Sequence, residues 1–292
     1  MDLQHIFKTD HPIIGVVHLL PLPTSPRWEG DLHEVMDRAE QEATALASGG
    51  VHGIIVENFF DTPFAKQQVD PAVVSAMTLV VQRLMNLITL PVGVNVLRND
   101  AQSALAIAAC TGAQFIRVNV LNGVTATDQG LIEGNAHQLL RYRRELGCDV
   151  KILADVLVKH GRSLSSSHVT TAVAETVERA LADAVILSGW ATGYPPSREE
   201  LELARTTAKH APVLIGSGAD LDNVANLMPA ADGVIVSSSL KRHGRIHQPV
   251  DPNRVRQFVD AVYRSLEPPQ LAEEKPTAEL EQQPPLPLKN SG

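Results

Sequence analysis

The chain has 292 residues, 44% of them hydrophobic and 20% charged, a composition typical of a globular protein with one large core or two modest ones. Its net charge of -8 argues against a broad nucleic-acid-binding face, so we expect no nucleic-acid partner. No run approaches the roughly 18 apolar residues that span a bilayer, and residues 1–10 lack the apolar segment of a secretion signal. Any contact with a membrane is therefore expected to be peripheral.

Short β-branched runs alternate with helical patterns about eight times, which is typical of parallel strands joined by helices. We expect strands at residues 13–18, 53–57, 92–96, 115–118, 150–156, 184–188, 213–216 and 233–236. Eight such strands predict a (β/α)8 TIM barrel, a fold of roughly 250 residues. An open doubly wound sheet is the alternative, but the first strand is followed by His-Leu-Leu-Pro-Leu-Pro instead of a Gly-x-Gly-x-x-Gly turn.

The first long helix is clearly delimited in the sequence. Asp31 can cap its N-terminus with Glu34 three residues further on, and Gly49-Gly50 can end it. Apolar residues at helical spacing form one stripe that is expected to lie against the barrel: Leu32, Val35, Met36, Ala39, Ala43 and Leu46.

The loop over residues 20–28 contains three prolines and ends in Trp28. Such a stiff segment can form a flap over the barrel mouth, or it can serve only as a rigid connector. The sequence leaves these two alternatives open.

The composition changes after residue 266. Residues 267–292 contain six prolines, five glutamates and two lysines, with no apolar period. Such a segment cannot bury enough surface to offset its ordering entropy. We therefore expect a barrel domain over residues 1–266 and a disordered tail over residues 267–292.

Two glycine- and serine-rich segments follow the last two predicted strands. Gly216-Ser217-Gly218 follows the seventh strand, and Ser237-Ser238 follows the eighth. Either segment alone could merely let a strand approach a helix closely. Together they match the place where (β/α)8 barrels bind phosphate, through backbone N–H groups in the loops after strands seven and eight. The pair predicts binding of a phosphorylated or otherwise anionic small molecule.

Polar residues end at least six of the eight predicted strands, and that end of the barrel is where active sites lie. The catalytic candidates are Glu57 and Asp155, whose carboxylates suit a general base or a ligand to a divalent cation, His18 or His160 as a group that transfers a proton, and Lys159 as a desolvated amine. Further ligand-binding candidates are Asn58, Asn95, Arg117, Asn119, His160, Ser188 and Thr192.

So many buried polar groups would cost several kcal/mol without a ligand, which favours a true pocket. A structural ion pair between Glu57 and Arg117 is the competing interpretation. His18, Glu57 and Asp155 could hold a metal ion, but no two of them have close ligand spacing, so no metal site is predicted and no cofactor is identified. Cys110 and Cys148 also lack such spacing and are expected to be buried small hydrophobic residues in a reducing compartment.

Several phrases of the sequence resemble one known family. They lie at residues 15–23, 56–58, 93–99, 115–119, 154–160, 188–193 and 216–218. Together they resemble the BtpA family over about residues 5–266. Many members of that family have glycine where this chain has Thr24, which bears only on the conformation of the loop over residues 20–28.

The resemblance implies a protein needed for accumulation and stability of the photosystem I reaction-centre complex, attached peripherally to the cytoplasmic side of the thylakoid membrane. Its partners would be reaction-centre subunits or the machinery that synthesises and assembles them. The family also has members in non-photosynthetic bacteria and archaea, which implies an enzyme of phosphorylated metabolites. An assembly scaffold and an enzyme both remain open, as does a homo-oligomer.

Overall fold

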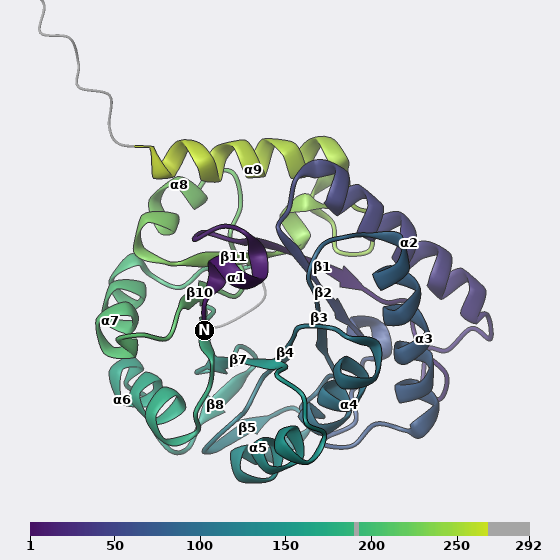
Figure 1. The fold of residues 1–292 in the computed structure, drawn as a ribbon, viewed down its shortest axis with the longest axis horizontal. Coiled ribbons are helices and arrows are strands. Elements are labelled where there is room, and N and C mark those ends of the chain that lie inside the picture. Colours follow the sequence, from purple (N-terminus) through teal and green to yellow (C-terminus); the bar gives the residue numbers. More distant parts are fainter. Residues whose placement is uncertain (190–192, 268–292) are drawn as a thin grey trace, which may run out of the picture.

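The structure is a computed structural model that describes residues 1–189 and 193–267. Eight parallel strands close into a barrel in the order β1-β11-β10-β9-β7-β4-β3-β2 (Figure 1). Their bounds are β1 (Ile13–His18), β2 (Gly53–Glu57), β3 (Val92–Asn95), β4 (Phe115–Val118), β7 (Lys151–Val156), β9 (Ala184–Leu187), β10 (Val213–Ile215) and β11 (Gly233–Val236). The predicted TIM barrel is confirmed, and each predicted strand forms with ends within one residue of those expected. Thr192 and residues 268–292 of the predicted tail lie outside the described residues.

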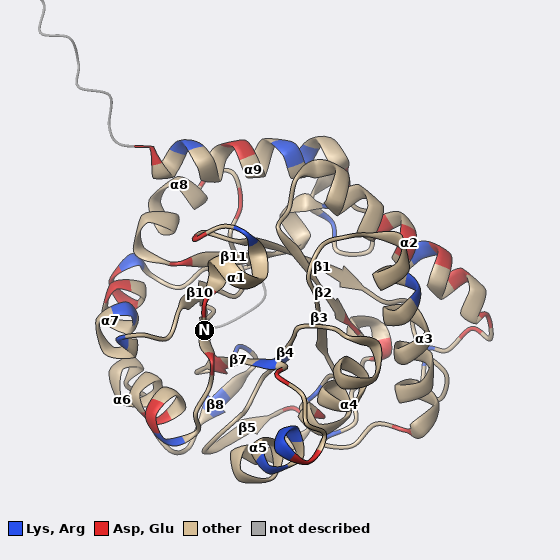
Figure 2. Cartoon of the chain, viewed as in Figure 1, with Lys and Arg blue, Asp and Glu red and all other residues tan. Residues whose placement is uncertain are grey.

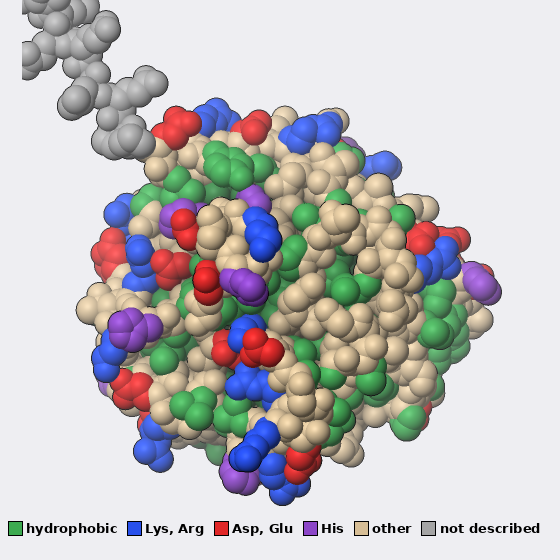
Figure 3. All heavy atoms as spheres, in the orientation of Figure 1, with side chains coloured by type: hydrophobic (Ala, Val, Ile, Leu, Met, Phe, Trp, Pro, Cys, Tyr) green, Lys and Arg blue, Asp and Glu red, His purple; other side chains and the backbone are tan. Residues whose placement is uncertain are grey.

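Helices surround the barrel, and α1 lies across one end of it (Figure 1). The helices are α1 (Leu3–Phe7), α2 (Leu32–Gly49), α3 (Pro71–Leu87), α4 (Ala101–Thr111), α5 (Ala136–Glu145), α6 (Val169–Ala174), α7 (Arg198–Ala208), α8 (Val224–Leu227) and α9 (Pro252–Leu266). Along α2 and α9, acidic and basic residues are interspersed (Figure 2). On the face that carries α1, described side chains of both signs are likewise mixed, with no broad patch of one charge (Figure 3).

Helix α2 forms as its sequence predicts. The Asp31 side chain accepts hydrogen bonds from the backbone N–H groups of His33 and Glu34, and Gly50 ends the helix in the left-handed conformation at φ 93°. Val35, Ala39, Ala43 and Leu46 of the predicted stripe are buried against the barrel, while Leu32 and Met36 are half-buried.

The barrel strands divide their side chains between two cores, because successive residues of a strand point to opposite faces. Ile13 and Val17 of β1 pack in the outer core between strands and helices. Ile14 and Val16 pack in the inner core, inside the barrel. The aromatic ring of Phe7 in α1 meets that of Phe115 edge-on at 5.4 Å, which closes the inner core at the N-terminal end of the barrel.

Glycine is needed at position 93 of β3 for a steric reason. A Cβ atom at Gly93 would lie 2.2 Å from the ring of Phe115, in the barrel interior. The missing side chain therefore makes room for the largest residue of the inner core.

A second, three-stranded antiparallel sheet lies outside the barrel in the order β6-β5-β8 and was not predicted. It is formed by β5 (Val124–Thr127), β6 (Gly130–Glu133) and β8 (Gly161–Ser163). These strands are three or four residues long and belong to the connections that follow β4 and β7. Their pairing depends on contacts between distant loops, which local sequence patterns do not specify.

The loop over residues 20–28 behaves as a connector. Leu22 is fully buried, and its backbone N–H donates to Asp61 Oδ1 at 2.7 Å. Thr24 adopts φ 73°, a left-handed conformation that favours glycine and so agrees with the glycine of many relatives. The loop is fixed to the barrel and lines neither of the cavities at the mouth described below.

The prediction that both cysteines are buried is wrong. Cys110 is exposed and Cys148 is partly exposed. Cys110 lies on the outer face of α4, opposite the buried Leu105 and Ala108. Among residues 1–189 and 193–267, no helix combines the length and apolar character that crossing a bilayer would require.

Candidate functional site

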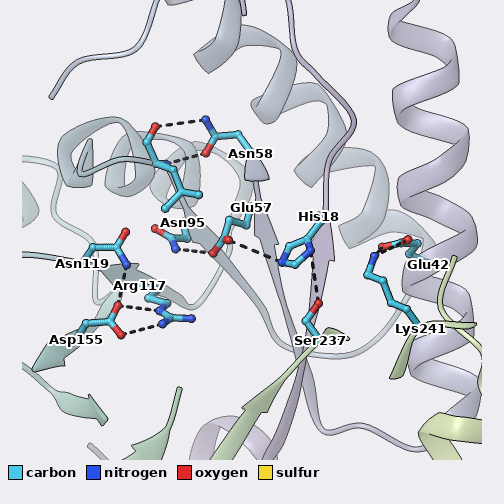
Figure 4. A network of polar contacts seen from close by, with 11 residues as sticks. His18, Glu42, Glu57, Asn58, Asn95, Arg117, Asn119, Asp155, Ser237 and Lys241 are labelled. Atoms are coloured by element: carbon cyan, nitrogen blue, oxygen red, sulfur yellow. Dashed lines mark hydrogen bonds and ion pairs between the residues drawn. The ribbon is translucent and has the colours of Figure 1, made fainter. Parts of the chain in front are cut away.

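A ring of polar positions lies at the C-terminal end of the barrel, one step above the inner core. Strand alternation explains this ring, because a residue two positions beyond an inner-core residue points into the same interior. On three strands an inner-core residue is followed two positions later by a polar one: Val16 by His18, Ile55 by Glu57, and Leu153 by Asp155. The complete ring is His18, Glu57, Asn95, Arg117, Asp155, Ser188, Gly216 and Ser237, all of which were predicted from the sequence. Figure 4 shows these residues except Ser188 and Gly216.

Arg117 and Asp155 form a buried ion pair in this ring (Figure 4). Arg117 Nε and Nη2 donate to the two carboxylate oxygens of Asp155 at 2.9 and 2.8 Å, and Asn119 Nδ2 donates to Asp155 Oδ2 at 2.8 Å. Burial acts to lower the pKa of Arg117, but the charge and hydrogen bonds of Asp155 raise it above its ordinary value. The predicted pair between Glu57 and Arg117 is therefore wrong, because Arg117 pairs with Asp155 on the neighbouring strand.

Glu57 lies beside this pair with a different set of contacts. It is 7% exposed, and its Oε2 accepts a hydrogen bond from Asn95 Nδ2 at 2.6 Å. Its Oε1 lies 3.8 Å from His18 Nε2. Asn95 therefore orients the carboxylate, and no cation forms a close bidentate pair with it in the described part of the chain.

His18 is held as a neutral imidazole. Its ring stacks on Phe59 with centroids 4.3 Å apart, and Nδ1 lies 3.5 Å from Ser237 Oγ. Burial lowers the pKa of His18 well below its ordinary range, and the nearby cations, Lys241 first, lower it further. A neutral imidazole can donate or accept one hydrogen bond at the mouth.

Lys159 follows β7 and is partly buried at the mouth. Burial lowers the pKa of this ammonium, and the charge of Arg117 lowers it further. The backbone carbonyl of Lys159 accepts a hydrogen bond from Arg98 Nη2 at 2.8 Å. The ammonium can therefore give up a proton more readily than that of an exposed lysine.

Two cavities open at this end of the barrel. The first, called here the β11 cavity, has a volume of about 390 Å³ and is bordered by the loops after β10 and β11. The second, called the β3 cavity, has a volume of about 480 Å³ and lies beside the loop after β3. Both are lined by the same four residues, which places them next to each other: Glu57, Phe59, Arg117 and Lys159.

The glycines bordering the β11 cavity allow close approach of neighbouring loops. A Cβ atom at Gly216 would lie 2.3 Å from Ile186, and Gly218, at φ 81°, packs against the backbone of Tyr194 and Pro195. Ser217 Oγ is buried without a hydrogen-bond partner among the described residues.

Backbone donors also face this cavity. Within the described ranges, no hydrogen bond is formed by the backbone N–H groups of Ser217, Gly218, Ser238 and Ser239. Arg254 of α9 borders the same cavity, and its Nε donates to the Ser239 carbonyl at 2.7 Å. Free N–H groups and a guanidinium are groups that bind an anion.

The remaining predicted residues occupy several places. Asn58 is buried below the mouth, where its Oδ1 accepts from the Leu97 N–H at 2.7 Å and its Nδ2 donates to Asp61 at 2.9 Å, and it lines neither cavity. Asp155 also lines neither the β11 cavity nor the β3 cavity. The Ser188 hydroxyl is buried beside Gly216 and has no hydrogen-bond partner within residues 1–189 and 193–267, and the exposed His160 lines the β3 cavity.

Two arginines and a glutamine are among the residues that border the cavities but were not predicted. Arg98 follows β3, Gln129 lies between β5 and β6, and Arg254 lies in the first turn of α9. The search for polar strand ends could have selected Arg98, which lies three residues beyond its strand. The turn Asp128-Gln129-Gly130 was the signal for the hairpin, whereas Arg254 lies on a helix and gave no signal.

No group of three His, Cys, Asp or Glu side chains is arranged to hold a metal ion within residues 1–189 and 193–267. Both carboxylate oxygens of Asp155 accept from Arg117 and Asn119, which makes that carboxylate a poor additional ligand.

Comparison with known proteins identifies similar chains over nearly the whole length. A model of the BtpA family matches residues 9–264. The photosystem I biogenesis protein BtpA of Synechocystis sp. is 70% identical over 266 residues, which cover 91% of this chain and 93% of that protein. An uncharacterized protein of Thermococcus kodakarensis is 44% identical over 85% of this chain and 94% of its own length, and the sgc region protein SgcQ of Escherichia coli is 30% identical over 89% and 97%.

Solved structures share the fold at low identity. Thiamine phosphate pyrophosphorylase from Pyrococcus furiosus has a TM-score of 0.56 and 14% identity over 88% of this chain and 98% of that chain. Tryptophan synthase from Mycobacterium tuberculosis has a TM-score of 0.55 and 19% identity over 88% and 92%. These likenesses support the barrel fold alone.

Removing the Asp155 charge should strongly destabilise the fold. Asp155→Asn leaves the buried guanidinium of Arg117 without its counter-ion, so we expect the free energy of unfolding to fall by about 3–5 kcal/mol in urea titrations. The matched control is Asp149→Asn, which breaks the exposed pair with Lys151 and should cost less than about 1 kcal/mol. Equal losses in the two variants would contradict the structural role of the Arg117–Asp155 pair.

His18 should make the stability depend on pH. The unfolded chain binds a proton at this imidazole below its ordinary pKa of 6.5, whereas the folded chain resists protonation because its pKa is lowered. The stability contributed by His18 is therefore complete above about pH 6.5 and is lost as the pH falls below that value, by at most about 1.4 kcal/mol per pH unit. Urea unfolding at pH 7 and pH 5 should show a smaller loss for His18→Gln than for the wild type. The exposed His33→Gln serves as control, and an unchanged loss in His18→Gln would contradict the expectation.

Proposed function

The chain belongs to the BtpA family, and we propose that it acts in photosystem I biogenesis, where it supports accumulation and stability of the reaction-centre complex. The observation that carries this proposal is its 70% identity, over 91% of the chain, to the photosystem I biogenesis protein of Synechocystis. Reaction-centre subunits or the machinery that synthesises and assembles them are the proposed partners.

We also propose a peripheral position at the thylakoid membrane, on its cytoplasmic side. The net charge of -8 disfavours attraction to an anionic lipid leaflet. Attachment through a protein partner is therefore favoured over attachment through lipid. A peripheral position agrees with the described helices, none of which is long and apolar enough to cross a bilayer.

The second proposed function is an enzyme acting on a small phosphorylated metabolite, and the barrel mouth is the observation that favours it. A phosphate would lie in the β11 cavity, where it would accept hydrogen bonds from the free N–H groups of Ser217, Gly218, Ser238 and Ser239 and face Arg254. The site is built from the loops after β10 and β11, the seventh and eighth barrel strands in chain order, where this fold binds phosphate.

The reacting part of such a molecule would lie where the two cavities meet. Glu57 borders both cavities and is oriented by Asn95, so its carboxylate is placed to accept a proton from the ligand. Lys159, with its lowered pKa, is placed to donate a proton, and transfer of the proton held by Glu57 to Lys159 then restores both groups. The neutral His18 can donate a hydrogen bond to an oxygen on which charge develops.

One chain can have both functions if its role in photosystem I biogenesis depends on the reaction catalysed at the barrel mouth. Relatives in an archaeon and in Escherichia coli cover 85% and 89% of this chain, so the whole barrel is shared beyond cyanobacteria. A site useful outside photosynthesis is therefore the simplest reason for a ligand-binding mouth.

Phosphate binding should depend on Arg254. Titration calorimetry with inorganic phosphate should show binding to the wild type, weakened about tenfold or more in Arg254→Ala, because a charge-assisted hydrogen bond is lost. Arg256→Ala removes an exposed guanidinium two residues away on the same helix and should leave the affinity unchanged. Equal affinities in all three proteins, or no binding of phosphate to a folded wild type, would reject the phosphate site.

The link between chemistry and photosystem I can be tested by complementation. In a Synechocystis strain whose relative has been deleted, the wild-type chain should restore photosystem I content, measured by light-induced oxidation of its primary donor. Glu57→Gln should fail to restore it at equal protein level if proton transfer is required, whereas the exposed Glu199→Gln should succeed. Full restoration by Glu57→Gln would favour a scaffold without catalysis, and failure of the wild type would reject the photosystem role.

The mode of membrane attachment predicts a simple fractionation result. Salt or chaotrope washing of thylakoid membranes should release the chain into the supernatant, because a peripheral contact through a protein has a polar, solvent-accessible rim and is not embedded in lipid. Retention after washing, with an integral membrane protein as the reference, would contradict peripheral attachment.

A further inference from the structure

The β3 cavity has no part in binding the proposed phosphate, yet it is as large as a small-molecule site. Its volume is about 480 Å³, and it continues from the β11 cavity past Glu57 and Lys159. A molecule with its phosphate in the β11 cavity therefore has room to extend into it. The chemical groups on its walls indicate what that extension must be.

Asn119 lines this cavity and carries a buried hydrogen-bond acceptor. Its amide orientation is fixed, because the carboxylate of Asp155 can only accept and so must face Asn119 Nδ2, at 2.8 Å. Asn119 Oδ1 then points away from Asp155 and is buried without a partner among the described residues, in a side chain only 4% exposed. An unpaired buried carbonyl of this kind requires an O–H or N–H donor.

Arg98 presents donors to the same cavity. It is 5% exposed, and within the described chain its guanidinium makes one hydrogen bond, from Nη2 to the carbonyl of Lys159. The other N–H groups require acceptors. Burial lowers the pKa of Arg98, while the charges of Asp155, Asp128 and Glu57 act in the opposite direction and favour the charged form.

The remaining walls combine another acceptor with apolar surface. Gln129 Oε1, at the tip of the β5–β6 hairpin, is also buried without a partner in the described chain. Phe59, Phe64 and Leu97 line the cavity beside it. Aromatic and aliphatic surface next to alternating donors and acceptors suits a carbon chain that carries hydroxyl groups, because each hydroxyl both donates and accepts.

We propose that the β3 cavity binds the neutral, hydroxyl-bearing part of a monophosphorylated sugar or polyol. The hydroxyl groups donate to Asn119 Oδ1 and Gln129 Oε1 and accept from Arg98. This inference rests on the proposed phosphate site, which holds the other end of the molecule.

A second anionic group fits the cavity less well than hydroxyl groups do. The charge of Arg98 is partly offset by the carboxylates of Asp155, Asp128 and Glu57, while Arg117 and Lys159 add positive charge to the same cavity. What disfavours a second carboxylate or phosphate is that it would leave Asn119 Oδ1 and Gln129 Oε1 without donors, which hydroxyl groups supply.

The test compares ligands that differ only in their hydroxyl groups. Titration calorimetry with ribitol 5-phosphate and pentyl phosphate, which share a five-carbon chain and one phosphate, should show at least tenfold tighter binding of the ribitol ester to the wild type. Arg98→Met and Gln129→Ala should each reduce this preference several-fold while leaving the affinity for inorganic phosphate unchanged. Gln68→Ala, at an exposed glutamine outside the cavity, is the matched control and should keep the preference. If Arg98→Met does not fold, Gln129→Ala carries the test alone.

The outcomes separate this inference from the phosphate site. Equal affinities for ribitol 5-phosphate and pentyl phosphate, with phosphate still bound, would overturn the hydroxyl site and leave the phosphate site standing. Tighter binding of ribitol 1,5-bisphosphate by tenfold or more over the monophosphate would overturn it in favour of a second anion site. No binding of inorganic phosphate or of any ester would overturn both.

Discussion

Closure of the barrel by β1 is the constraint on which the site depends. Strand β1 pairs with β11 on one side, where Gly15 lies opposite Val236, and with β2 on the other, where His18 lies opposite Glu57. This double pairing brings the start of the chain beside its last strand, so Ser237 reaches His18 across more than 200 residues of sequence. The register also places Glu57 opposite Asn95 of β3. A slip of one residue would turn His18 out of the mouth and Val17 into it.

A buried ion pair then fixes the loop that follows β11. Lys241 is fully buried, and its ammonium lies 2.8 and 2.9 Å from the two carboxylate oxygens of Glu42 on α2 (Figure 4). Forming such a pair gains little, because both charges are desolvated, but losing one partner would leave the other charge buried and unpaired. The pair therefore specifies where Ser237 and Ser238 lie more than it stabilises the fold. The same ammonium lowers the pKa of His18, so one contact sets both the shape and the electrostatics of the mouth.

The sequence predicted the barrel and its polar ring well because both follow from local periodicity. Eight β-branched runs gave the strands, and counting in twos from Val16 or Ile55 leads to His18 or Glu57 without knowledge of tertiary contacts. What could not be predicted depends on partners far apart in the sequence. Arg117 pairs with Asp155 instead of Glu57, and Arg254 packs on the loop after β11. In both cases the tertiary structure selects one partner among several that the sequence would allow. Cys110 was misplaced because the outer and inner faces of an alanine-rich helix such as α4 differ little in hydrophobicity.

The unpaired polar atoms at the mouth connect the two proposed functions energetically. Each buried donor or acceptor without a partner, such as Asn119 Oδ1 or Ser217 Oγ, costs the folded chain about 1–3 kcal/mol. A ligand that satisfies these atoms would recover that energy on binding, and any ligand that binds only the folded chain stabilises it in proportion to the logarithm of its concentration. If the proposed metabolite binds at the mouth, the chain is more stable when that metabolite is abundant. A role in photosystem I biogenesis could then follow the supply of that metabolite through the amount of folded protein, even where partner binding and catalysis use different surfaces.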